Sequence, residues 1–279
     1  MTRLRTSDIE HIVGSLAAYD RELLRKTGRT LRGVACHAAG ADEDSTAEML
    51  GQMQARVIPV TTGEGLIRGF SEAVAAIVSH IGMETTITQK TNVAGLAEAV
   101  GNGADVVFLS DDDDFVVLHL RTRRVCHNSE ATAAGFVAAL DLMAGGMSGR
   151  KALVLGCGAV GSAAAVEVIN RGGIVSLFDT DSERSTGAAV ELRGAFETEV
   201  RVCANLPTAL AEHELLIEAT DSAGVIETAA VSAESWIAAL GMPLGLTCDA
   251  ATKAFDRMIH DPLQIGVATM AVESVKGLS

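Results

Sequence analysis

The sequence predicts an α/β protein in which a small N-terminal α/β substrate domain is followed by a Rossmann dinucleotide-binding domain. Three observations support this fold class. Short apolar runs alternate with helical patterns in each half of the chain. A glycine-rich motif at Gly156 lies between such a run and a helical pattern. The 279 residues are 48% hydrophobic but only 3% aromatic, which suits aliphatic helices packed on parallel strands.

The first domain, residues 1–146, is expected to begin with helices. Residues 7–26 carry Ile, Val and Leu at helical spacing, and Ser7 with Glu10 matches a capping box. Shorter helices are expected at residues 31–39 and 42–53. The rest of this domain should alternate strands at 56–61, 84–87, 105–109 and 115–120 with helices at 66–81, 92–100 and 129–144.

The second domain, residues 147–279, begins after Gly145-Gly146, which is expected to end the preceding helix. Its last segment, residues 263–279, contains a helix that is expected to pack back on the first domain. Strands are expected at 151–155, 174–178, 215–218 and 244–247, with a helix at 158–171.

Residues 156–161 read GCGAVG and fit the pattern GxGxxG. They follow an apolar strand and begin a helix, which is the position that this motif has in dinucleotide-binding proteins. Gly156 permits the tight turn, Gly158 lets the backbone approach a pyrophosphate, and Gly161 lets the helix lie close to the strand. Val160 lies at the helix N-terminus, where free N–H groups favour an anion.

An acid follows the next strand. Asp179 lies 23 positions after Gly156, where a carboxylate binds the adenosine ribose and repels the 2′-phosphate of NADP, so NAD is the expected cofactor. Arg184 lies further along and could weaken that preference. Ala219 and Thr220 end another strand, where a Rossmann domain borders the ribose and nicotinamide; a strand end with a capping Thr fits equally well.

Charge and composition narrow the function class. The net charge of −14 disfavours nucleic acid and anionic membranes as partners. The five cysteines include no CxxC pair, no signal-type segment opens the chain, and no apolar run has membrane-span length, so a cytoplasmic location is expected. No metal site is expected, because the four aspartates at 111–114 do not form a DxDxDG loop. Apolar helices in both domains are compatible with a homodimer.

Three polar segments of the first domain are expected to converge on the cleft between the domains. They are residues 60–65, 110–115 and 127–129, and the first two lie at the carboxyl ends of strands, where α/β sheets bind ligands. His127 and Cys157 are interpreted as structural side chains.

The chain resembles the PylD family, the dehydrogenases that complete pyrrolysine biosynthesis. The resemblance runs through IPVTTGEGLIRGFSEAV, TNVAGLAEAVGNGADVVFLSDDDDF, the Asn128 region, GCGAVG, the EAT strand end and DPLQIG, in the same order over nearly the whole chain. The VTTGEG and DD segments are far more specific than GxGxxG. Thr62 stands where the family has Ser, so the hydroxyl is kept and a methyl group is added.

This resemblance implies NAD-dependent oxidation of the ornithine side-chain amine of L-lysine-Nε-3R-methyl-D-ornithine, loss of ammonia to give an aldehyde, and ring closure to pyrrolysine. Asp111 is the expected catalytic carboxylate, which would bind the amine directly or through a water and accept its proton. Thr62 and Asn128 would contact the substrate, and residues 4–8, with Leu4, would cover it.

Two other function classes remain open. A shikimate- or methylene-tetrahydropterin-dehydrogenase-like oxidoreductase would share the two-domain layout, with Lys90 and Asp111 as a Lys–Asp pair, although the NxTxPxK segment of shikimate dehydrogenases is absent. A non-catalytic Rossmann protein that senses NAD(H) would bind the cofactor without amine-dependent hydride transfer. It would not need the polar residues Thr62, Asp111 and Asn128.

Overall fold

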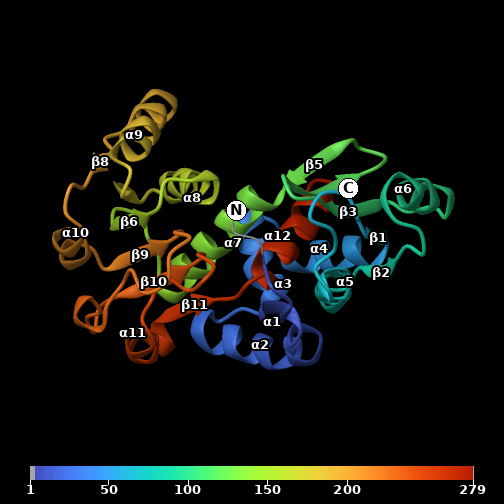
Figure 1. The fold of residues 1–279 in the computed structure, drawn as a ribbon, viewed down its shortest axis with the longest axis horizontal. Coiled ribbons are helices and arrows are strands. Elements are labelled where there is room, and N and C mark those ends of the chain that lie inside the picture. Colours follow the sequence, from blue (N-terminus) through green and yellow to red (C-terminus); the bar gives the residue numbers. More distant parts are fainter. Residues whose placement is uncertain (1–3, 279) are drawn as a thin grey trace. The chain divides into compact units, whose positions relative to one another are not determined.

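The computed structural model describes residues 4–278, and its contacts divide the chain into two compact units (Figure 1). The mixed-sheet unit contains residues 4–25, 29–135 and 262–278. The Rossmann unit contains residues 26–28 and 136–261. The domain limits expected from the sequence stay a prediction, because compactness does not measure independent folding.

The mixed-sheet unit is built on a five-stranded sheet with the order β2-β1-β3-β4-β5. Its first three strands are parallel, and two antiparallel strands complete one edge. The β3–β4 connection is a tight turn, so residues 111–114 lie at the carboxyl end of β3. The strands are β1 (Gln54–Ile58), β2 (Glu84–Ile87), β3 (Val106–Ser110), β4 (Phe115–His119) and β5 (Arg124–His127).

Helices cover this sheet, and the last helix of the chain is the most buried of them. Helix α12 (Gln264–Val275) contacts α3, α5 and β4 of the same unit, and Ile265, Val267 and Met270 are fully buried. The other helices are α1 (Thr6–Ile9), α2 (Ile12–Thr27), α3 (Leu31–Ala39), α4 (Glu43–Gly51), α5 (Phe70–His80), α6 (Asn92–Gly101) and the first half of α7 (Asn128–Met143).

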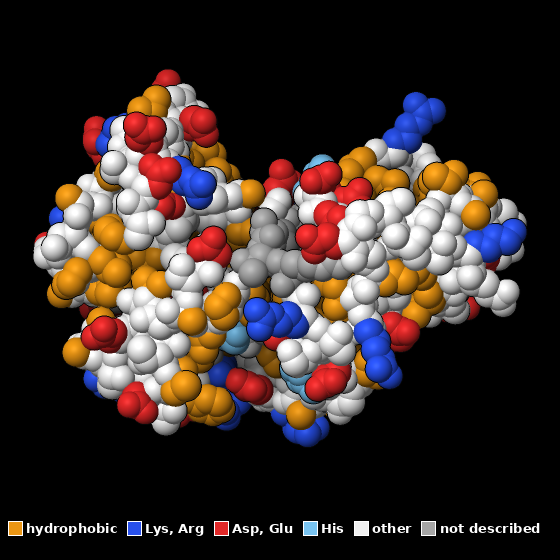
Figure 2. Space-filling model, viewed as in Figure 1, with side chains coloured by type: hydrophobic (Ala, Val, Ile, Leu, Met, Phe, Trp, Pro, Cys, Tyr) orange, Lys and Arg blue, Asp and Glu red, His pale blue; other side chains and the backbone are white. Residues whose placement is uncertain are grey.

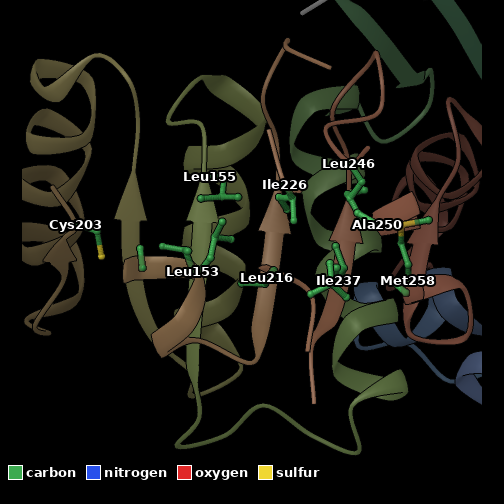
Figure 3. Close-up of a cluster of buried hydrophobic side chains, with 14 residues drawn as sticks. Leu153, Leu155, Cys203, Leu216, Ile226, Ile237, Leu246, Ala250 and Met258 are labelled. Atoms are coloured by element: carbon green, nitrogen blue, oxygen red, sulfur yellow. The ribbon is translucent and has the colours of Figure 1, made fainter. Parts of the chain in front are cut away.

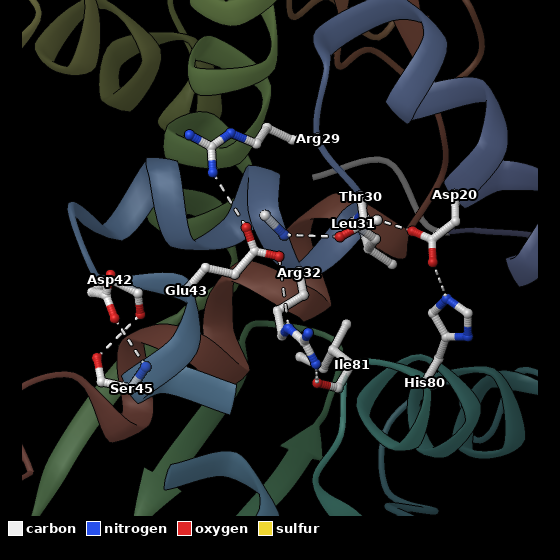
Figure 4. Close-up of polar contacts among 11 residues, drawn as sticks. Asp20, Arg29, Thr30, Leu31, Arg32, Asp42, Glu43, Ser45, His80 and Ile81 are labelled. Atoms are coloured by element: carbon white, nitrogen blue, oxygen red, sulfur yellow. Dashed lines mark hydrogen bonds and ion pairs between the residues drawn. The ribbon is translucent and has the colours of Figure 1, made fainter. Parts of the chain in front are cut away.

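Polar contacts fix the helices of the mixed-sheet unit to one another (Figure 4). The Asp20 carboxylate on α2 accepts the Leu31 N–H at 2.7 Å and lies 2.6 Å from His80 Nε2. On α4, Glu43 lies 3.3 Å from the Arg29 guanidinium and 3.9 Å from that of Arg32. Asp20 thereby links α2 to both α3 and α5.

The Rossmann unit is a six-stranded parallel sheet with the order β11-β10-β9-β6-β7-β8. The chain starts this sheet at β6 and adds strands on both sides of it. The strand order therefore reverses between β6 and β9, the position where such folds bind ligands. The strands are β6 (Lys151–Leu155), β7 (Ile174–Phe178), β8 (Arg201–Val202), β9 (Leu215–Glu218), β10 (Trp236–Ala239) and β11 (Met258–His260).

Aliphatic side chains from this sheet form its core. Leu153, Leu216 and Ile237 come from neighbouring strands and are fully buried in one cluster (Figure 3). Burial of each such side chain contributes about 1.5–3 kcal/mol. The helices of this unit are α8 (Ala159–Asn170), α9 (Ser182–Phe196), α10 (Leu206–Glu212) and α11 (Cys248–Ala254), with the second half of α7.

The predicted fold class is confirmed, but the N-terminal helix is not the single helix expected. Residues 7–26 belong to two helices, α1 and α2, separated by a turn. The Asp8 carboxylate accepts the Arg5 N–H at 2.7 Å, so Asp8 occupies the acidic position of the cap. Ser7 consequently lies inside α1 and does not cap it.

The first strand ends earlier than the expected range 56–61. Strand β1 stops at Ile58 because Pro59 has no N–H to donate to a neighbouring strand. The Thr61 N–H instead donates to the Asn92 side chain at 2.7 Å. The following loop is therefore longer than expected, and α5 begins at Phe70 instead of at Leu66.

The expected strand at residues 244–247 is wrong. This stretch is a loop in which Leu246 makes only an isolated bridge to Ile226. Strands β10 and β11, for which the pattern gives no prediction, complete the sheet instead. The loop N–H groups are used elsewhere, and that of Gly245 donates to the carboxylate of Glu218.

Acidic side chains are scattered over the visible face of the protein (Figure 2). This distribution agrees with the net charge of −14. Within the described part of the chain, no helix combines the length and the hydropathy of a membrane-spanning segment.

Candidate active site

The glycine-rich loop after β6 packs tightly against the neighbouring strand and helix. Gly156 has φ of 87°, and its N–H donates to the Phe178 carbonyl at 2.9 Å. A Cβ at Gly156 would lie 2.7 Å from the Ala219 carbonyl oxygen, and one at Gly161 would lie 3.0 Å from the Gly156 carbonyl carbon. Both glycines are thus needed for the loop to lie against β9 and for α8 to lie against the loop.

Gly158 is different, because nothing in the protein requires a glycine there. Its φ of −74° is open to any residue, and a Cβ would meet no atom within 4 Å. Gly158 precedes the first residue of α8, and no side chain caps that helix. No side chain therefore satisfies the first N–H groups of α8, among them that of Val160, and a helix N-terminus of this kind favours an anion.

Asp179 follows β7 and holds the loop. One carboxylate oxygen accepts the Cys157 N–H at 2.7 Å, and the other accepts the Asp181 N–H at 2.9 Å. Burial, and then the charge of Asp179, raises the pKa of the Cys157 thiol to about 12, so this thiol stays protonated and unreactive. Arg184 pairs with Asp181 at 3.4 Å.

The end of β9 borders the same loop. A Cβ at Gly156 would lie 3.2 Å from the backbone nitrogen of Thr220, so Ala219 and Thr220 lie directly against the first glycine of the motif. Thr220 is half-buried, whereas the preceding Glu218 is fully buried. Glu218 is not among the site residues predicted from the sequence, although an acid at the end of a buried strand is itself an unusual signal.

In the mixed-sheet unit, Asp111 sits in an exposed turn and its side chain shapes that turn. Its Oδ1 accepts the N–H groups of Asp113 and Asp114, both at 2.9 Å. These hydrogen bonds, that of Asp114 first, lower the pKa of Asp111 below its ordinary value, because they stabilise the charged form. Asp111 is therefore an ionised carboxylate and a weak base.

The loop that contains Thr62 lies against this turn. The Glu64 N–H donates to Asp112 Oδ2 at 2.7 Å. Gly63 has φ of 69°, and the Asp112 carboxylate occupies the space that a Cβ would fill. Thr62 is exposed in the same loop. Sequence reasoning missed Asp112, because the pattern does not show which of four successive aspartates points toward the loop.

The end of β5 also joins the acidic turn. His127 Nδ1 lies 2.7 Å from Asp114 Oδ2, with both side chains about half exposed. Asn128 follows as the first residue of α7 and is buried; its Oδ1 accepts the Thr132 hydroxyl at 3.3 Å. The structure thus brings together the three segments that contain Thr62, Asp111 and Asn128.

Leu4 lies apart from these contacts. It is half-buried and precedes α1, a helix that packs against α5 in the same unit. In the described residues, no three His, Cys, Asp or Glu side chains are grouped as ligands for a metal ion.

Comparison with known proteins shows which family the chain resembles. A sequence profile described as the N-terminal domain of the pyrrolysine biosynthesis protein PylD matches residues 8–126. The pyrrolysine synthase of Methanosarcina acetivorans is 28% identical over 272 residues, which cover 97% of this chain and 98% of that protein. The chain is thus similar to the PylD family over nearly its whole length.

Solved structures support an NAD(P)-binding fold for this chain. Quinate dehydrogenase from Corynebacterium glutamicum in complex with NAD has a TM-score of 0.56 at 15% identity and covers 81% of this chain and 94% of its own. Shikimate 5-dehydrogenase from Thermus thermophilus in complex with NADP(H) and shikimate has a TM-score of 0.52 at 18% identity, with coverage of 81% and 94%. At such identities the likeness shows the fold alone.

Proposed function

We propose that this protein oxidises the ornithine side-chain amine of L-lysine-Nε-3R-methyl-D-ornithine. The carbon that bears the amine loses a hydride and the nitrogen loses a proton, which leaves an imine. Water adds to the imine and ammonia leaves, which gives an aldehyde. The ornithine α-amine then condenses with the aldehyde and releases water to form the pyrroline ring. Ring closure is intramolecular and needs little assistance from the protein.

NAD+ is the proposed cofactor and, when bound, supplies the hydride acceptor. The open backbone at Gly158 and the first N–H groups of α8 support a pyrophosphate site. Asp179 follows β7, where its charge would accept ribose hydroxyl donors and oppose a 2′-phosphate. Arg184, the cation that could weaken this preference, is paired with Asp181.

The observation that carries the proposal is the ionised Asp111 carboxylate on a turn that contacts the Thr62 loop and the strand before Asn128. An anion at this position suits a substrate that arrives as an ammonium ion. We assign Thr62 and Asn128 to polar groups of the substrate. Leu4 is assigned to a cover over the substrate because it precedes α1.

Asp111 holds the amine and does not take its proton. An ammonium ion has a pKa of about 10.4 and an aspartate about 3.9, so proton transfer between them costs about 9 kcal/mol. The hydrogen bonds from Asp113 and Asp114 lower the pKa of Asp111 and enlarge this cost. We therefore assign to Asp111 the orientation of the amine, and later of the water that attacks the imine, while solvent accepts the proton.

The test is NADH formation, followed at about 340 nm as the reporter of hydride transfer, with the purified protein, NAD+ and L-lysine-Nε-D-ornithine. Amine-dependent NADH together with a pyrroline product by mass spectrometry supports the proposal. Silence with this amine and with its methylated form, in protein that binds NADH, contradicts it. That outcome would leave a different dehydrogenase or an NAD(H) sensor.

A matched pair of variants tests the role of Asp111. Asp111→Asn keeps Oδ1 as an acceptor for the two N–H groups of the turn but removes the charge. We expect kcat/KM for the amine to fall about 10- to 100-fold, the loss of one charge-assisted hydrogen bond, with NADH affinity unchanged. Asp113→Asn makes the same charge change on the same turn and should reduce kcat/KM less than about threefold. Equal effects of the two variants would contradict the assignment.

A further inference from the structure

The end of β9 carries a fully buried carboxylate that the proposed reaction does not use. Glu218 is 0% exposed, and three donors converge on its two oxygens. Oε1 accepts the Thr220 N–H at 2.7 Å and the Thr220 hydroxyl at 2.5 Å, and Oε2 accepts the Gly245 N–H at 3.2 Å. Three converging donors suit an ionised, acceptor-only carboxylate.

The surrounding backbone is shaped to hold this side chain. A Cβ at Gly241 would lie 2.6 Å from one carboxylate oxygen, and a Cβ at Gly245 would lie 2.5 Å from it. The backbone oxygen of Glu218 also accepts the N–H groups of Leu240 at 2.7 Å and Gly241 at 3.0 Å. Glu218 therefore ties together the loop after β9 and the loop after β10.

These contacts determine which way the Thr220 hydroxyl is polarised. Its proton is directed at the Glu218 carboxylate. Thr220 Oγ1 also accepts the Ser222 N–H at 3.5 Å, so one of its two lone pairs remains to accept a further hydrogen bond. Thr220 is half-buried and lies against Gly156, the first glycine of the dinucleotide loop. If the carboxylate were replaced, the hydroxyl could turn to the Ser222 carbonyl, 3.3 Å away.

We propose that Glu218 is a positioning residue for the dinucleotide: it fixes the Thr220 hydroxyl as an acceptor for an N–H or O–H donor on the nicotinamide-ribose half of NAD(H). The inference rests on the proposed function only in taking NAD(H) as the cofactor. Burial raises the pKa of Glu218, against the opposing effect of its hydrogen bonds to Thr220 and Gly245. Keeping the Glu218 carboxylate ionised in this buried position therefore costs free energy, which suits a residue with a specific task.

The test compares ligands that contain different parts of the dinucleotide. Binding of NADH, ADP-ribose and AMP is measured by calorimetry on wild-type protein and on Glu218→Gln, Thr220→Val and Thr220→Ser, without any amine present. Glu218→Gln and Thr220→Val should each raise the Kd of NADH about five- to tenfold, the loss of about one hydrogen bond. The Kd of AMP, which has only the adenine half, should stay within about twofold.

Two further results are expected if Glu218 acts through Thr220. Thr220→Ser keeps the hydroxyl and should bind NADH like the wild type. The double variant Glu218→Gln/Thr220→Val should bind NADH no more weakly than Thr220→Val alone, because the two changes remove the same interaction. ADP-ribose identifies the donor: a loss of affinity equal to that of NADH places it on the ribose, and a smaller loss places it on the nicotinamide.

The proposal is overturned if Thr220→Val binds NADH as tightly as the wild type. Thr220→Val decides this even if Glu218→Gln fails to fold, because Thr220 is only half-buried. An equal loss of AMP and NADH affinity would also overturn it, since that result indicates general disorder of the loop. NADH binding that depends on Thr220, without amine oxidation, would reject the proposed reaction and keep this inference.

Discussion

Replacing single glycines of the dinucleotide loop by alanine separates cofactor binding from folding. A Cβ at Gly158 would point into space that no protein atom occupies within 4 Å, where we place the pyrophosphate. A Cβ at Gly161 would collide with the carbonyl of Gly156, which is backbone and cannot rotate away. Gly158→Ala should therefore abolish binding in a stable protein, whereas Gly161→Ala should destabilise the fold itself.

The magnitudes follow from the local geometry. At Gly158, alanine reduces the entropy of the unfolded chain and adds about 0.4–1 kcal/mol of stability, but it is a poorer helix N-cap than glycine by a similar amount. The net change in the free energy of unfolding should stay within about 1 kcal/mol. At Gly161, overpacking costs about 1–3 kcal/mol. At about 2–4 °C per kcal/mol, Gly161→Ala should lower Tm by about 2–12 °C.

The assay is thermal unfolding with and without NADH. At 100 times its Kd, NADH stabilises the wild type by about 2.7 kcal/mol and should raise Tm by about 5–11 °C. Gly158→Ala should unfold near the wild-type temperature without cofactor and lose this increase. A Gly158→Ala protein that NADH stabilises as fully as the wild type would refute the placement of the pyrophosphate. A Gly161→Ala protein with unchanged Tm would refute the packing argument.

Three other predictions concern acidic groups and their neighbours. Asp179→Ala should raise the Kd of NADH about tenfold. The control Asp181→Ala removes the cap on the Glu183 N–H, so it should lower Tm by a few degrees and leave the Kd of NADH unchanged. The reverse pattern would exclude Asp179 from the ribose site. Gly63→Ala places a side chain at φ of 69° in the space of the Asp112 carboxylate. This variant should have a lower Tm and a lower kcat/KM for the amine, with NADH affinity unchanged. A wild-type Tm together with a wild-type kcat/KM would show that the loop contact with Asp112 is dispensable. The pKa of Glu218 is raised above 4.5 in the folded state, so the folded state binds a proton on this carboxyl group more tightly than the unfolded state does. The stability that this proton contributes is lost as pH rises through the folded pKa. Urea unfolding between about pH 5 and about pH 8 should show the stability of wild type falling relative to Glu218→Gln, and a constant difference would contradict the raised pKa.

The start of the Rossmann unit was predictable from the sequence, although β8, β10, β11 and helices α9 to α11 were not. Its strand–glycine loop–helix unit has a fixed residue spacing, and Lys151–Leu155 and Ile174–Phe178 are the strands predicted. The reason is physical, because Gly156 and Gly161 each face a backbone group that admits no side chain. The glycines of the motif therefore record in the local sequence a constraint that neighbouring backbone imposes.

Contacts between distant segments were beyond sequence reasoning. The pattern predicts a strand at 244–247, but the Gly245 N–H bonds to Glu218, 27 residues earlier. Strand β10 contains the short apolar run Trp236–Ala239, which periodicity alone does not distinguish from a buried helix. In the candidate site, the sequence led to the polar segments and the structure supplied Asp112 and Asp114 as the residues that join them.

The two notable carboxylates argue against a carboxylate base for the proton of the substrate amine. Hydrogen bonds lower the pKa of Asp111, and Glu218 is buried with three donors of its own. If solvent takes the proton, kcat/KM should rise about tenfold per pH unit from neutral pH toward the amine pKa of about 10.4, because only the neutral amine can lose hydride. Asp111→Asn should lower the whole profile without changing its slope. A plateau that begins near neutral pH would instead require a protein base, and His127, 2.7 Å from Asp114 on the same turn, is then the side chain to replace.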